Sequence, residues 1–417
     1  MRTHYDIIVL GAGAAGIATS IIARRSGVSV LVIEKDGFGG TCPLRGCIPK
    51  KILSAAAESV ACVQRASEHR VSVKGAELNW KDLIELKRLM IRDVSRNARN
   101  RFHSLGIDTI NGPARFTGPK SVAVEGKEYR ARKIVIATGS KPRKLPIPGF
   151  EHVLTSDDLF ELDALPGSVV FIGGGAVGME FAHIFARAGS RVTILEAASR
   201  VLPDMDEDVV RELGKFTRSL GVEISAGVHV ESIQKTREGS AVTLNIPNLT
   251  VSSTIHADIV ANGAGRVADI DGLDLDKAGV DTDHRGIVVD EYLRSVSNKD
   301  VFAAGDVVSL SPHLSPVASY EGHIVAHNIT SDDLKDRDYR TVPAAVYTIP
   351  AAAGVGLTEH EAKKQGLDFT TASHDLLGLR MSSIYAEQAA YSKVIIESRS
   401  DRILGAHILG HNAQDSV

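Results

Sequence analysis

The sequence predicts an α/β protein in which one strand–helix–strand unit occurs twice and a strand-rich part follows at the C-terminal end. Residues 5–34 and 168–196 each combine two apolar strands, a glycine-rich turn and a helix. Short β-branched runs separated by turns follow each unit. After Tyr339 the pattern changes to strands with one helix, and 417 residues exceed what one core usually holds. We therefore expect several domains.

Each element is justified by its local pattern. Short apolar runs bounded by turns indicate strands, and longer runs with apolar residues at helical spacing indicate helices. In the first part we expect a strand (5–10), a helix (14–25), a buried strand ending in an acid (28–34), two long helices (47–69 and 80–104) and a β-meander (113–137). In the second part we expect the repeated unit (168–196), short strands (222–261), a strand (301–308) and a helix to about residue 330.

Composition excludes several classes of function. Hydrophobic residues make up 43% and charged residues 24% of the chain, as in soluble globular proteins. A net charge of −3 provides no polycationic face, so we expect no nucleic-acid partner. Three cysteines do not make an extracellular disulfide framework.

The apolar N-terminus has two interpretations. Arg2 and His4 before an apolar run resemble a secretory signal. Asp6, the spaced glycines and the polar continuation "RRSG" favour a strand, a turn and a helix instead. No other apolar run reaches the roughly 20 residues of a membrane helix. We expect a cytoplasmic protein without a membrane partner.

The first glycine turn predicts dinucleotide binding. Gly11, Gly13 and Gly16 lie between a strand and a helix, and Glu34 closes the next strand. Gly11 permits the tight turn, Gly13 lets a pyrophosphate approach the helix N-terminus, and Gly16 lets helix and strand pack closely. Glu34 is placed to accept hydrogen bonds from ribose hydroxyls.

A second turn of the same kind indicates a second dinucleotide. Gly173, Gly175 and Gly178 repeat the spacing, and Glu196 closes the next strand. Two dinucleotides on one chain suit hydride transfer between a nicotinamide and a flavin. Glu196 favours NADH, because a carboxylate binds the free 2′-hydroxyl and repels a 2′-phosphate, and the nearby Arg200 weakens this preference.

The stretch "GGTCPLRGCIPKK" carries two cysteines, Cys42 and Cys47. A zinc half-site is one alternative, but Cys62 is the only other cysteine and no histidine pair with matching spacing lies nearby. A pair of buried thiols is another, but the setting is polar and rich in glycine. We favour a redox-active disulfide and predict no metal site.

The residues after Cys47 support a reactive thiol. Pro49 suits the first turn of a helix that begins near Cys47. The helix dipole, Lys50 and Lys51 favour the thiolate over the thiol.

With these motifs the chain resembles the pyridine nucleotide–disulfide oxidoreductases of class I, the flavoenzyme family of glutathione reductase, dihydrolipoamide dehydrogenase and mercuric reductase. The resemblance covers essentially all 417 residues. "GGTCPLRGCIPKK" matches the redox motif, and "IVIATGS", "NGAGRV" and "VFAAGDV" match further cofactor motifs. The segments "LSPVASYEGHIVAHNI" and "VPAAVYTIPAAAGVGLTEHEA" resemble those that lead into and open the dimerisation domain.

The resemblance implies roles by position. Cys47 would lie against the flavin as the charge-transfer thiolate, and Cys42 would be the outer thiol that attacks substrate. Lys50 or Lys51 would pair with Glu180 near the reducible flavin nitrogen. The cofactor-binding residues that it implies are Gly11, Gly13, Gly16, Glu34, Gly40, Thr41, Lys51, Gly112, Ala114, Thr138, Gly139, Gly173, Gly175, Gly178, Glu196, Gly265 and Asp306.

It also implies FAD and NAD(P)H as cofactors, a homodimer and two Rossmann-like domains followed by an α+β dimerisation domain. We expect the FAD-binding domain with the redox disulfide over 1–150, the NAD(P)-binding domain over 151–280, the second FAD-binding or central part over 281–338 and an incomplete dimerisation domain over 339–417.

Two departures bear on substrate and catalysis. Ile21, Ile22 and Ala98 stand where glutathione reductases carry arginines and a tyrosine, which argues against glutathione. None of the 15 histidines precedes a proline, whereas the family ends with a catalytic His-Pro motif. Either the sequence is truncated or the protein lacks that acid–base pair. We expect His183 to be a structural residue rather than a catalyst.

The sequence thus predicts electron transfer between NAD(P)H, FAD, the Cys42–Cys47 disulfide and a small disulfide or dithiol, in either direction. Three substrate alternatives stay open, namely dihydrolipoamide, glutathione disulfide and mercuric ion. A flavin-bearing NADH diaphorase or redox-sensing subunit without disulfide turnover is a further alternative.

Overall fold

The computed structural model of the chain describes residues 2–245 and 253–417 and divides into two units, each with its own core. The first unit comprises Met1–Pro49, Arg88–Lys141 and Arg266–Tyr339. The second comprises Lys50–Lys87, Pro142–Gly265 and Arg340–Val417. Both units are assembled from segments far apart in the sequence.

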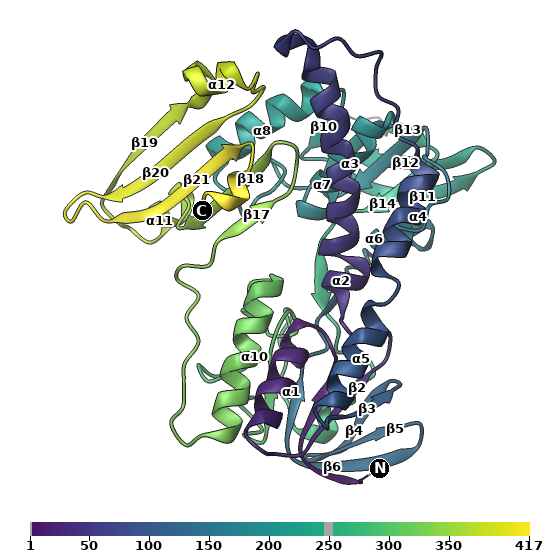
Figure 1. The fold of residues 1–417 in the computed structure, drawn as a ribbon, viewed down its shortest axis with the longest axis vertical. Coiled ribbons are helices and arrows are strands. Elements are labelled where there is room, and N and C mark those ends of the chain that lie inside the picture. The colour runs from purple at the N-terminus through teal and green to yellow at the C-terminus, as the bar shows by residue number, and fades with distance from the viewer. Residues whose placement is uncertain (1, 246–252) are drawn as a thin grey trace. The chain divides into compact units, whose positions relative to one another are not determined.

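A seven-stranded sheet forms the centre of the first unit (Figure 1). Its order is β3-β2-β1-β6-β5-β4, and β16 also pairs with β6. Parallel pairing joins β3, β2, β1, β6 and β16, and β4, β5 and β6 form the predicted antiparallel meander. The strands are β1 (His4–Leu10), β2 (Val30–Glu34), β3 (Asp108–Asn111), β4 (Ala114–Gly118), β5 (Ser121–Val124), β6 (Lys127–Ile136) and β16 (Val301–Ala303).

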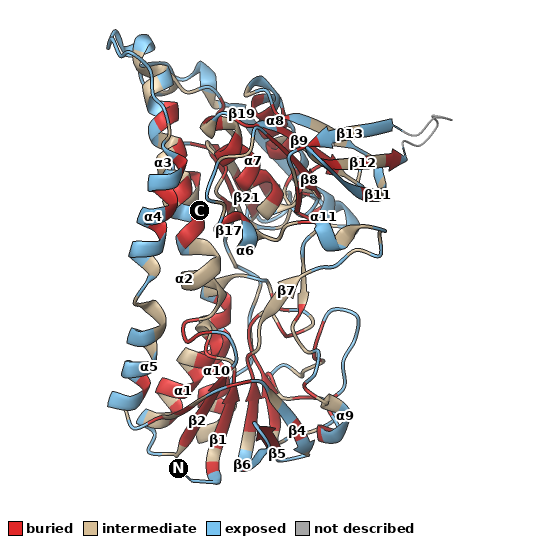
Figure 2. Ribbon diagram, turned by 90° about the vertical axis from the view of Figure 1, so that its right-hand side faces the viewer, coloured by how far each residue is buried: buried red, intermediate tan, exposed pale blue. Residues whose placement is uncertain are grey.

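Alternation along β1 gives this sheet two buried faces. Ile7 and Val9 pack on one face, whose core also includes residues of helices α1 (Ala14–Arg25) and α10 (Ser315–Thr330). Ile8 and Leu10 pack on the other, in a core that includes residues of the meander. Figure 2 shows β1 and β2 buried along most of their length. The remaining elements of the unit are α2 (Thr41–Arg45), α5 (Val94–Ser104), β7 (Ser140–Pro142), β15 (Arg266–Ala268) and α9 (Leu275–Ala278).

The two long helices predicted at 47–69 and 80–104 are each shorter than expected. Helix α3 spans Cys47–Arg65 and is followed by a 3-10 turn, η1 (Ala66–His69). Helix α4 (Trp80–Ile91) ends before α5 begins, so the prediction of one helix was wrong. The break has a physical reason: apolar residues of α4 belong to the core of the second unit, and Phe102 of α5 belongs to a core of the first.

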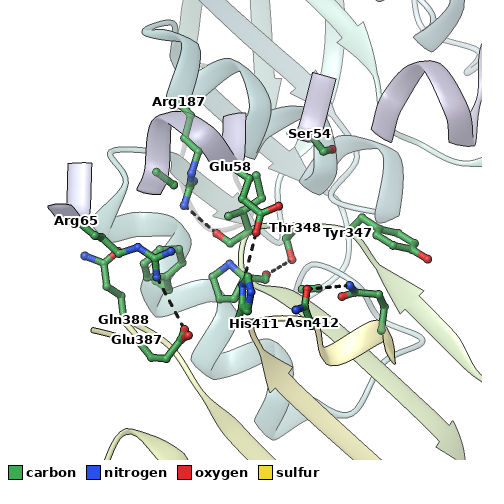
Figure 3. Close-up of a pocket in the computed structure, with 16 residues that line it drawn as sticks. Ser54, Glu58, Arg65, Arg187, Tyr347, Thr348, Glu387, Gln388, His411 and Asn412 are labelled. Carbon is green, nitrogen blue, oxygen red and sulfur yellow. Dashed lines mark hydrogen bonds and ion pairs between the residues drawn. The ribbon is translucent and has the colours of Figure 1, made fainter. Parts of the chain in front are cut away.

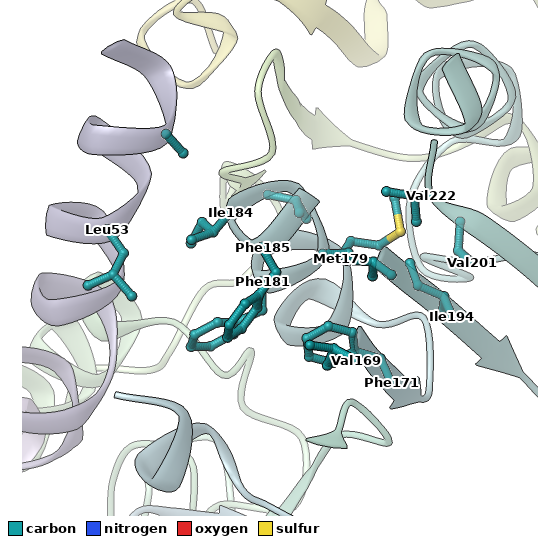
Figure 4. Packing of buried hydrophobic residues seen from close by; sticks show 14 of the residues in the cluster. Leu53, Val169, Phe171, Met179, Phe181, Ile184, Phe185, Ile194, Val201 and Val222 are labelled. Carbon is teal, nitrogen blue, oxygen red and sulfur yellow. The ribbon is translucent and has the colours of Figure 1, made fainter. Parts of the chain in front are cut away.

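The second unit contains a four-stranded parallel sheet of order β10-β9-β8-β14 and a three-stranded antiparallel sheet of order β11-β12-β13. Phe181 and Phe185 of helix α7 pack in its main core, and Leu53 of α3 belongs to the same cluster (Figure 4). The elements are η2 (Phe150–His152), α6 (Ser156–Leu159), β8 (Ser168–Ile172), α7 (Ala176–Ala188), β9 (Arg191–Glu196), α8 (Glu207–Ser219), β10 (Glu223–Ala226), β11 (His229–Thr236), β12 (Gly239–Asn245), β13 (Ser253–Ala257) and β14 (Ile259–Asn262).

A five-stranded antiparallel sheet of order β17-β18-β21-β20-β19 ends the chain. Two short helices accompany it, α11 (Glu359–Lys364) and α12 (Arg380–Ile384), where the sequence predicted one. Its other elements are β17 (Ala344–Val346), β18 (Ala351–Gly356), β19 (Phe369–Asp375), η3 (Leu376–Gly378), β20 (Tyr391–Glu397), β21 (Ile403–Gly410) and η4 (Ala413–Asp415).

A buried lysine fastens this sheet to α8. Lys393 of β20 is 3% exposed, and its Nζ lies 3.2 Å from Asp206, 2.5 Å from Asp208 and 2.6 Å from Glu359. Asp206 and Asp208 lie at the start of α8, and Glu359 begins α11. One ammonium group therefore joins the five-stranded sheet to a helix of the dinucleotide-type part.

The two Rossmann-like sheets and the C-terminal sheet confirm the predicted fold class. Within residues 2–245 and 253–417, no helix has the length and apolar content needed to cross a membrane.

Candidate active site

The first glycine turn lies at the point where the strand order of the sheet reverses. The chain leaves β1 toward β2 and β3 and returns to β6 on the other side, so the loops after β1 and β6 meet there. Gly11 has a φ of 105°, and a Cβ on it would lie 2.2 Å from the carbonyl oxygen of Ala137. A Cβ on Gly16 would lie 2.0 Å from the carbonyl oxygen of Gly11. Both glycines are required by close backbone contact.

Gly13 is different, because the nearest atom to a Cβ there is Gly40 Cα at 3.8 Å. Gly13 caps α1 without a side-chain hydrogen bond, and the first turn of the helix has no acidic residue. The first N–H groups of α1 are thus not capped by a side chain of the turn, and the helix dipole favours an anion there. Gly40 has a φ of 74° and packs against Gly13, and Thr41 follows it as the first residue of α2.

Glu34 uses part of its hydrogen-bonding capacity to shape the loops around it. Its Oε2 accepts from the backbone N–H of Ala12 at 2.7 Å, and its Oε1 accepts from Asp36 at 2.8 Å and from Gly37 at 3.3 Å. A carboxylate offers about four acceptor positions, so capacity remains for a ribose hydroxyl. Gly112 donates its N–H to the carbonyl of Glu34 at 2.8 Å. Ala114 lies in β4, paired with Val124.

The loop after β6 fits a ligand. Thr138 Oγ1 is buried and has no hydrogen-bond partner among the described residues. A buried hydroxyl of this kind calls for an external partner. Gly139, with a φ of 69°, accepts from Asp269 N–H at 2.9 Å. The space at Gly13 leaves room for a ligand, and the Thr138 hydroxyl can hydrogen-bond to one. Both features are compatible with a dinucleotide bound to the first unit.

Asp306 follows β16 and faces the same loop. Its Oδ2 accepts a hydrogen bond from Ser140 Oγ at 2.7 Å. Arg266 donates to Ser140 Oγ at 2.8 Å and to the Ser140 carbonyl at 2.6 Å. The last residue of "IVIATGS" therefore orients Asp306, a role that the sequence did not assign.

The fully buried carboxylate of Glu321 hydrogen-bonds to the loop that carries Asp306. Glu321 Oε2 accepts from the Gly305 N–H at 2.5 Å, and Oε1 accepts from Ser311 Oγ at 2.6 Å and from the Tyr339 hydroxyl. The pKa of Glu321 is raised above its usual value, because the effect of burial outweighs the opposite effect of the hydrogen bonds from Ser311 and Tyr339. Glu321 lies within the quoted "LSPVASYEGHIVAHNI", but only the tertiary contact reveals what it does.

The second glycine turn repeats the geometry of the first. β8 and β14 flank the point where this sheet reverses its order. A Cβ on Gly173 would lie 2.4 Å from the carbonyl carbon of Gly263, and one on Gly178 would lie 2.3 Å from the carbonyl oxygen of Gly173. Gly175 caps α7 without a side-chain hydrogen bond. Gly265, with a φ of 92°, accepts from the Arg143 N–H at 3.0 Å.

Glu196 resembles Glu34 in its bonding, with Oε2 accepting from Gly174 at 2.6 Å and Oε1 from Ala198 at 2.7 Å. Arg200 is not available to attract a 2′-phosphate against the repulsion from Glu196. Its guanidinium donates to the backbone carbonyls of Leu202 and Pro203 at 2.7 Å and of Met205 at 2.9 Å. The expectation that Arg200 weakens the preference of Glu196 for NADH therefore lacks support, because Arg200 is engaged in shaping its own loop.

The two cysteines lie on adjacent helical segments of the first unit. Cys42 is in α2, Cys47 is the first residue of α3, and Gly46 separates the two helices. Both cysteines are half-buried. Cys47 therefore lies at the N-terminus of a helix, where the helix dipole favours an anion. Cys62 is exposed on the same helix.

Of the two candidate lysines, Lys50 is the one that pairs with Glu180. Its Nζ lies 2.8 Å from Glu180 Oε1, and the two side chains are 8% and 12% exposed. The backbone N–H of Tyr347 donates to the same oxygen at 2.8 Å. Lys51 is exposed, and its Nζ lies 4.2 Å from the centre of the Tyr347 ring, as does that of Lys50.

One face of α7 continues this contact along the segment 347–350. His183, fully buried, accepts from the Ile349 N–H at 3.3 Å and bonds Thr217 Oγ1 at 2.9 Å. Arg187 donates to the Ile349 carbonyl at 2.9 Å (Figure 3). Burial, and then the charge of Arg187, lower the pKa of His183 to about 3. The structure agrees with a structural role for His183.

A cavity of about 90 Å³ lies beside this segment, lined also by α3, α8 and the residues around η4. Among the described residues, Ser54 Oγ and the Nε and Nη1 atoms of Arg187 are buried beside it without a hydrogen-bond partner. Figure 3 shows His411 and Glu58 paired across it, with 3.5 Å between His411 Nδ1 and Glu58 Oε1. The cavity is far too small for a dinucleotide.

The chain matches known proteins over nearly its whole length. Residues 5–322 match the pyridine nucleotide-disulphide oxidoreductase family, and residues 342–417 match its dimerisation domain. The chain is 32% identical to a glutathione reductase of Burkholderia cepacia, over all of this chain and 91% of that protein. It is 30% identical to a dihydrolipoyl dehydrogenase of Bacillus subtilis, over all of this chain and 91% of that protein. It is also 30% identical to a mercuric reductase of Lysinibacillus sphaericus, over 99% of this chain and 76% of that protein.

Proposed function

Because the chain belongs to the pyridine nucleotide–disulphide oxidoreductase family, we propose that it carries electrons from NADH through FAD to the Cys42–Cys47 pair and on to a small disulfide. The protein is an oxidoreductase that uses FAD and NAD(P)H. When bound, FAD accepts a hydride from the nicotinamide and hands two electrons to a disulfide. The observation that carries the proposal is the cysteine pair at the start of α3, on a chain with two glycine turns of the dinucleotide type.

The residues that would hold FAD surround the first glycine turn. The open backbone at Gly13 and the first turn of α1 would take the pyrophosphate, and Glu34 would take the ribose. Thr138 would donate its unpaired hydroxyl, and Asp306, oriented by Ser140, would accept from the ribityl chain. Lys50, held by Glu180, would act near the reducible nitrogen.

In the proposed thiol–disulfide exchange, the bonds and electrons balance between the cysteine pair and the substrate disulfide. Two electrons break the Cys42–Cys47 bond and leave two sulfur nucleophiles. The Cys42 thiolate attacks one sulfur of the substrate disulfide, forms a mixed disulfide and releases one substrate thiolate. The Cys47 thiolate then attacks Cys42, releases the second substrate thiolate and restores the internal disulfide. The substrate gains the two electrons that the pair loses.

NADH is the proposed electron donor. Glu196 keeps acceptor capacity at the end of β9, and the guanidinium of Arg200 is engaged with backbone carbonyls. A 2′-phosphate would meet a carboxylate without a free cation from Arg200. This observation supports NADH over NADPH.

A homodimer is proposed on two grounds. The C-terminal sheet matches the dimerisation domain of the family. Met381, Ile384 and Tyr385, at and beside α12, expose 53–59% of their surface. Apolar side chains exposed together indicate an interaction surface. Replacing Met381 and Ile384 by Lys should shift the protein toward monomer in sedimentation velocity, and an unchanged distribution would place the interface elsewhere.

Steady-state turnover tests the function as a whole. NADH oxidation by FAD-loaded protein should be stimulated by at least one of lipoamide, glutathione disulfide or mercuric ion, and Cys42→Ser should abolish the stimulation. Lipoamide is the first substrate to test, because Ile21 is buried in the core of the first unit and offers no cation to glutathione. Reduction of artificial electron acceptors alone, equal in wild type and Cys42→Ser, would instead indicate a diaphorase.

A further inference from the structure

We propose that Tyr347 is a positioning residue, whose aromatic face sets the places of the Lys50 and Lys51 ammonium groups. The inference deepens the proposed function and rests on it, because Lys50 and Lys51 matter only if a flavin is bound and reduced. Nothing in the sequence motifs assigned a role to Tyr347, although it lies within "VPAAVYTIPAAAGVG".

The contacts converge on one side chain. Lys50 Nζ and Lys51 Nζ each lie 4.2 Å from the centre of the Tyr347 ring. A cation within about 6 Å of an aromatic face is attracted by the negative potential of that face. Two consecutive lysines of α3 thus share one ring, and that ring limits where both ammonium groups can move.

Two like charges on one ring also need compensation. Lys50 receives it from Glu180, whose Oε1 lies 2.8 Å from Nζ. Lys50 is 7% exposed and Lys51 is exposed to solvent, so water compensates the second charge. The ring contact should consequently matter more for the desolvated Lys50 than for Lys51.

Tyr347 can position other groups because its own backbone is fixed. Its N–H donates to Glu180 Oε1 at 2.8 Å, the oxygen that also binds Lys50. Two residues further on, Ile349 is held by His183 through its N–H and by Arg187 through its carbonyl. Glu180, His183 and Arg187 follow one another at helical spacing on α7, so one helix face fixes the segment 347–350.

The experiment compares Tyr347→Leu, which removes the aromatic face, with Tyr347→Phe, which keeps it. Tyr292→Leu is the matched control, because it removes another ring from a cation: the guanidinium carbon of Arg294 lies 5.0 Å from the centre of the Tyr292 ring. The rate at which NADH reduces the flavin is measured by stopped flow on FAD-loaded protein, together with the flavin midpoint potential. A cation–aromatic contact of about 1–2 kcal/mol at the desolvated Lys50 predicts that Tyr347→Leu slows reduction by roughly 5- to 30-fold. Tyr347→Phe and Tyr292→Leu should stay within about 2-fold of wild type.

If Tyr347→Leu does not fold, a variant with pentafluorophenylalanine at position 347 tests the proposal instead. Fluorine withdraws electrons from the ring face while leaving a ring of similar shape, so the reduction rate and the midpoint potential should move toward those expected for the Leu variant. A pentafluorophenylalanine protein that equals Tyr347→Phe in both measurements would overturn the proposal. A wild type that NADH does not reduce would instead refute the proposed function.

Discussion

Lys50 and Glu180 form a nearly buried ion pair, with 2.8 Å between Lys50 Nζ and Glu180 Oε1. Glu180→Leu would leave the Lys50 ammonium buried without its carboxylate and the Tyr347 N–H without its acceptor. Removing one partner of a buried pair costs about 3–5 kcal/mol. We expect a loss of that order in the free energy of unfolding, measured by urea denaturation, and a smaller loss for Glu180→Gln, which retains an acceptor. Equal losses for both variants would contradict this expectation, because they would show that the acceptor kept by Gln compensates for nothing and that the lost charge accounts for the whole effect.

Coenzyme choice is predicted from Glu196 and Arg200. NADH should reduce the flavin faster than NADPH, and Glu196→Arg should narrow or reverse the ratio, because it removes the repulsion of a 2′-phosphate. Arg200→Gln should leave the ratio of the two rates unchanged within about 2-fold, since its guanidinium is engaged with the carbonyls of Leu202 and Met205. Stopped-flow reduction with each coenzyme measures both. A wild type that prefers NADPH would contradict this assignment.

Two buried cations should differ in how much stability the protein loses when each is replaced by Met. The pKa of Lys393 is raised: burial alone lowers it, but hydrogen bonds to Asp208 and Glu359 outweigh that effect. Lys393→Met would leave the buried carboxylate of Asp206 without this cation, and we expect it to cost about 3–5 kcal/mol of unfolding free energy. Arg187 is 8% exposed, and among the described residues its guanidinium has one hydrogen-bond partner, the carbonyl of Ile349. Burial, then the charge of Arg65, lower its pKa to about 10.

Arg187→Met should therefore cost no more than about 1 kcal/mol, because it removes a desolvated charge without a carboxylate partner. Parallel urea denaturation of both variants gives the comparison. If Arg187→Met proved as damaging as Lys393→Met, the guanidinium would have a partner that the contacts described above do not include.

The lowered pKa of His183 predicts that the protein loses stability in mild acid. Its pKa is about 3 in the folded protein and 6.5 when unperturbed. Between those values the unfolded chain binds a proton that the folded chain does not, so stability falls as pH falls, by about 1.4 kcal/mol per pH unit. From pH 6.5 to 5 the contribution should be a loss of roughly 2 kcal/mol.

His183→Gln removes this titration while other groups titrate as before. The difference in unfolding free energy between wild type and His183→Gln should shrink as pH falls from 7 to 5. A difference that stays constant over that range would show that His183 gains its proton in the folded state.

The features that could be predicted from the sequence are those imposed by backbone geometry. Gly11, Gly16 and Gly173 contact backbone atoms so closely that no side chain fits, and such positions leave a fixed spacing of glycines. The short apolar run Ile7–Leu10 likewise predicted β1, because a strand buried on both faces carries apolar residues on both sides.

The features that could not be predicted depend on contacts between distant segments. Lys50 and Lys51 are equivalent in sequence, and only the position of Glu180 on α7 distinguishes them. Arg200 looked like a phosphate ligand until its contacts showed that it bonds its own loop. Glu321 and Tyr347 stand in recognised motifs without a local pattern that predicts their roles. The break between α4 and α5 arises because the two helices contribute to different cores.

The central claim is that electrons from NADH reach the Cys42–Cys47 pair through a bound flavin. The most direct test is anaerobic thiol labelling of FAD-loaded protein before and after one equivalent of NADH, with the labelled cysteines identified by mass spectrometry. Before NADH, label should enter the exposed Cys62 alone. After NADH, Cys42 and Cys47 should also be labelled, and Cys62→Ser should leave only these two. Flavin that bleaches fully and stays reduced, with Cys42 and Cys47 labelled to the same extent before and after NADH, would contradict the account.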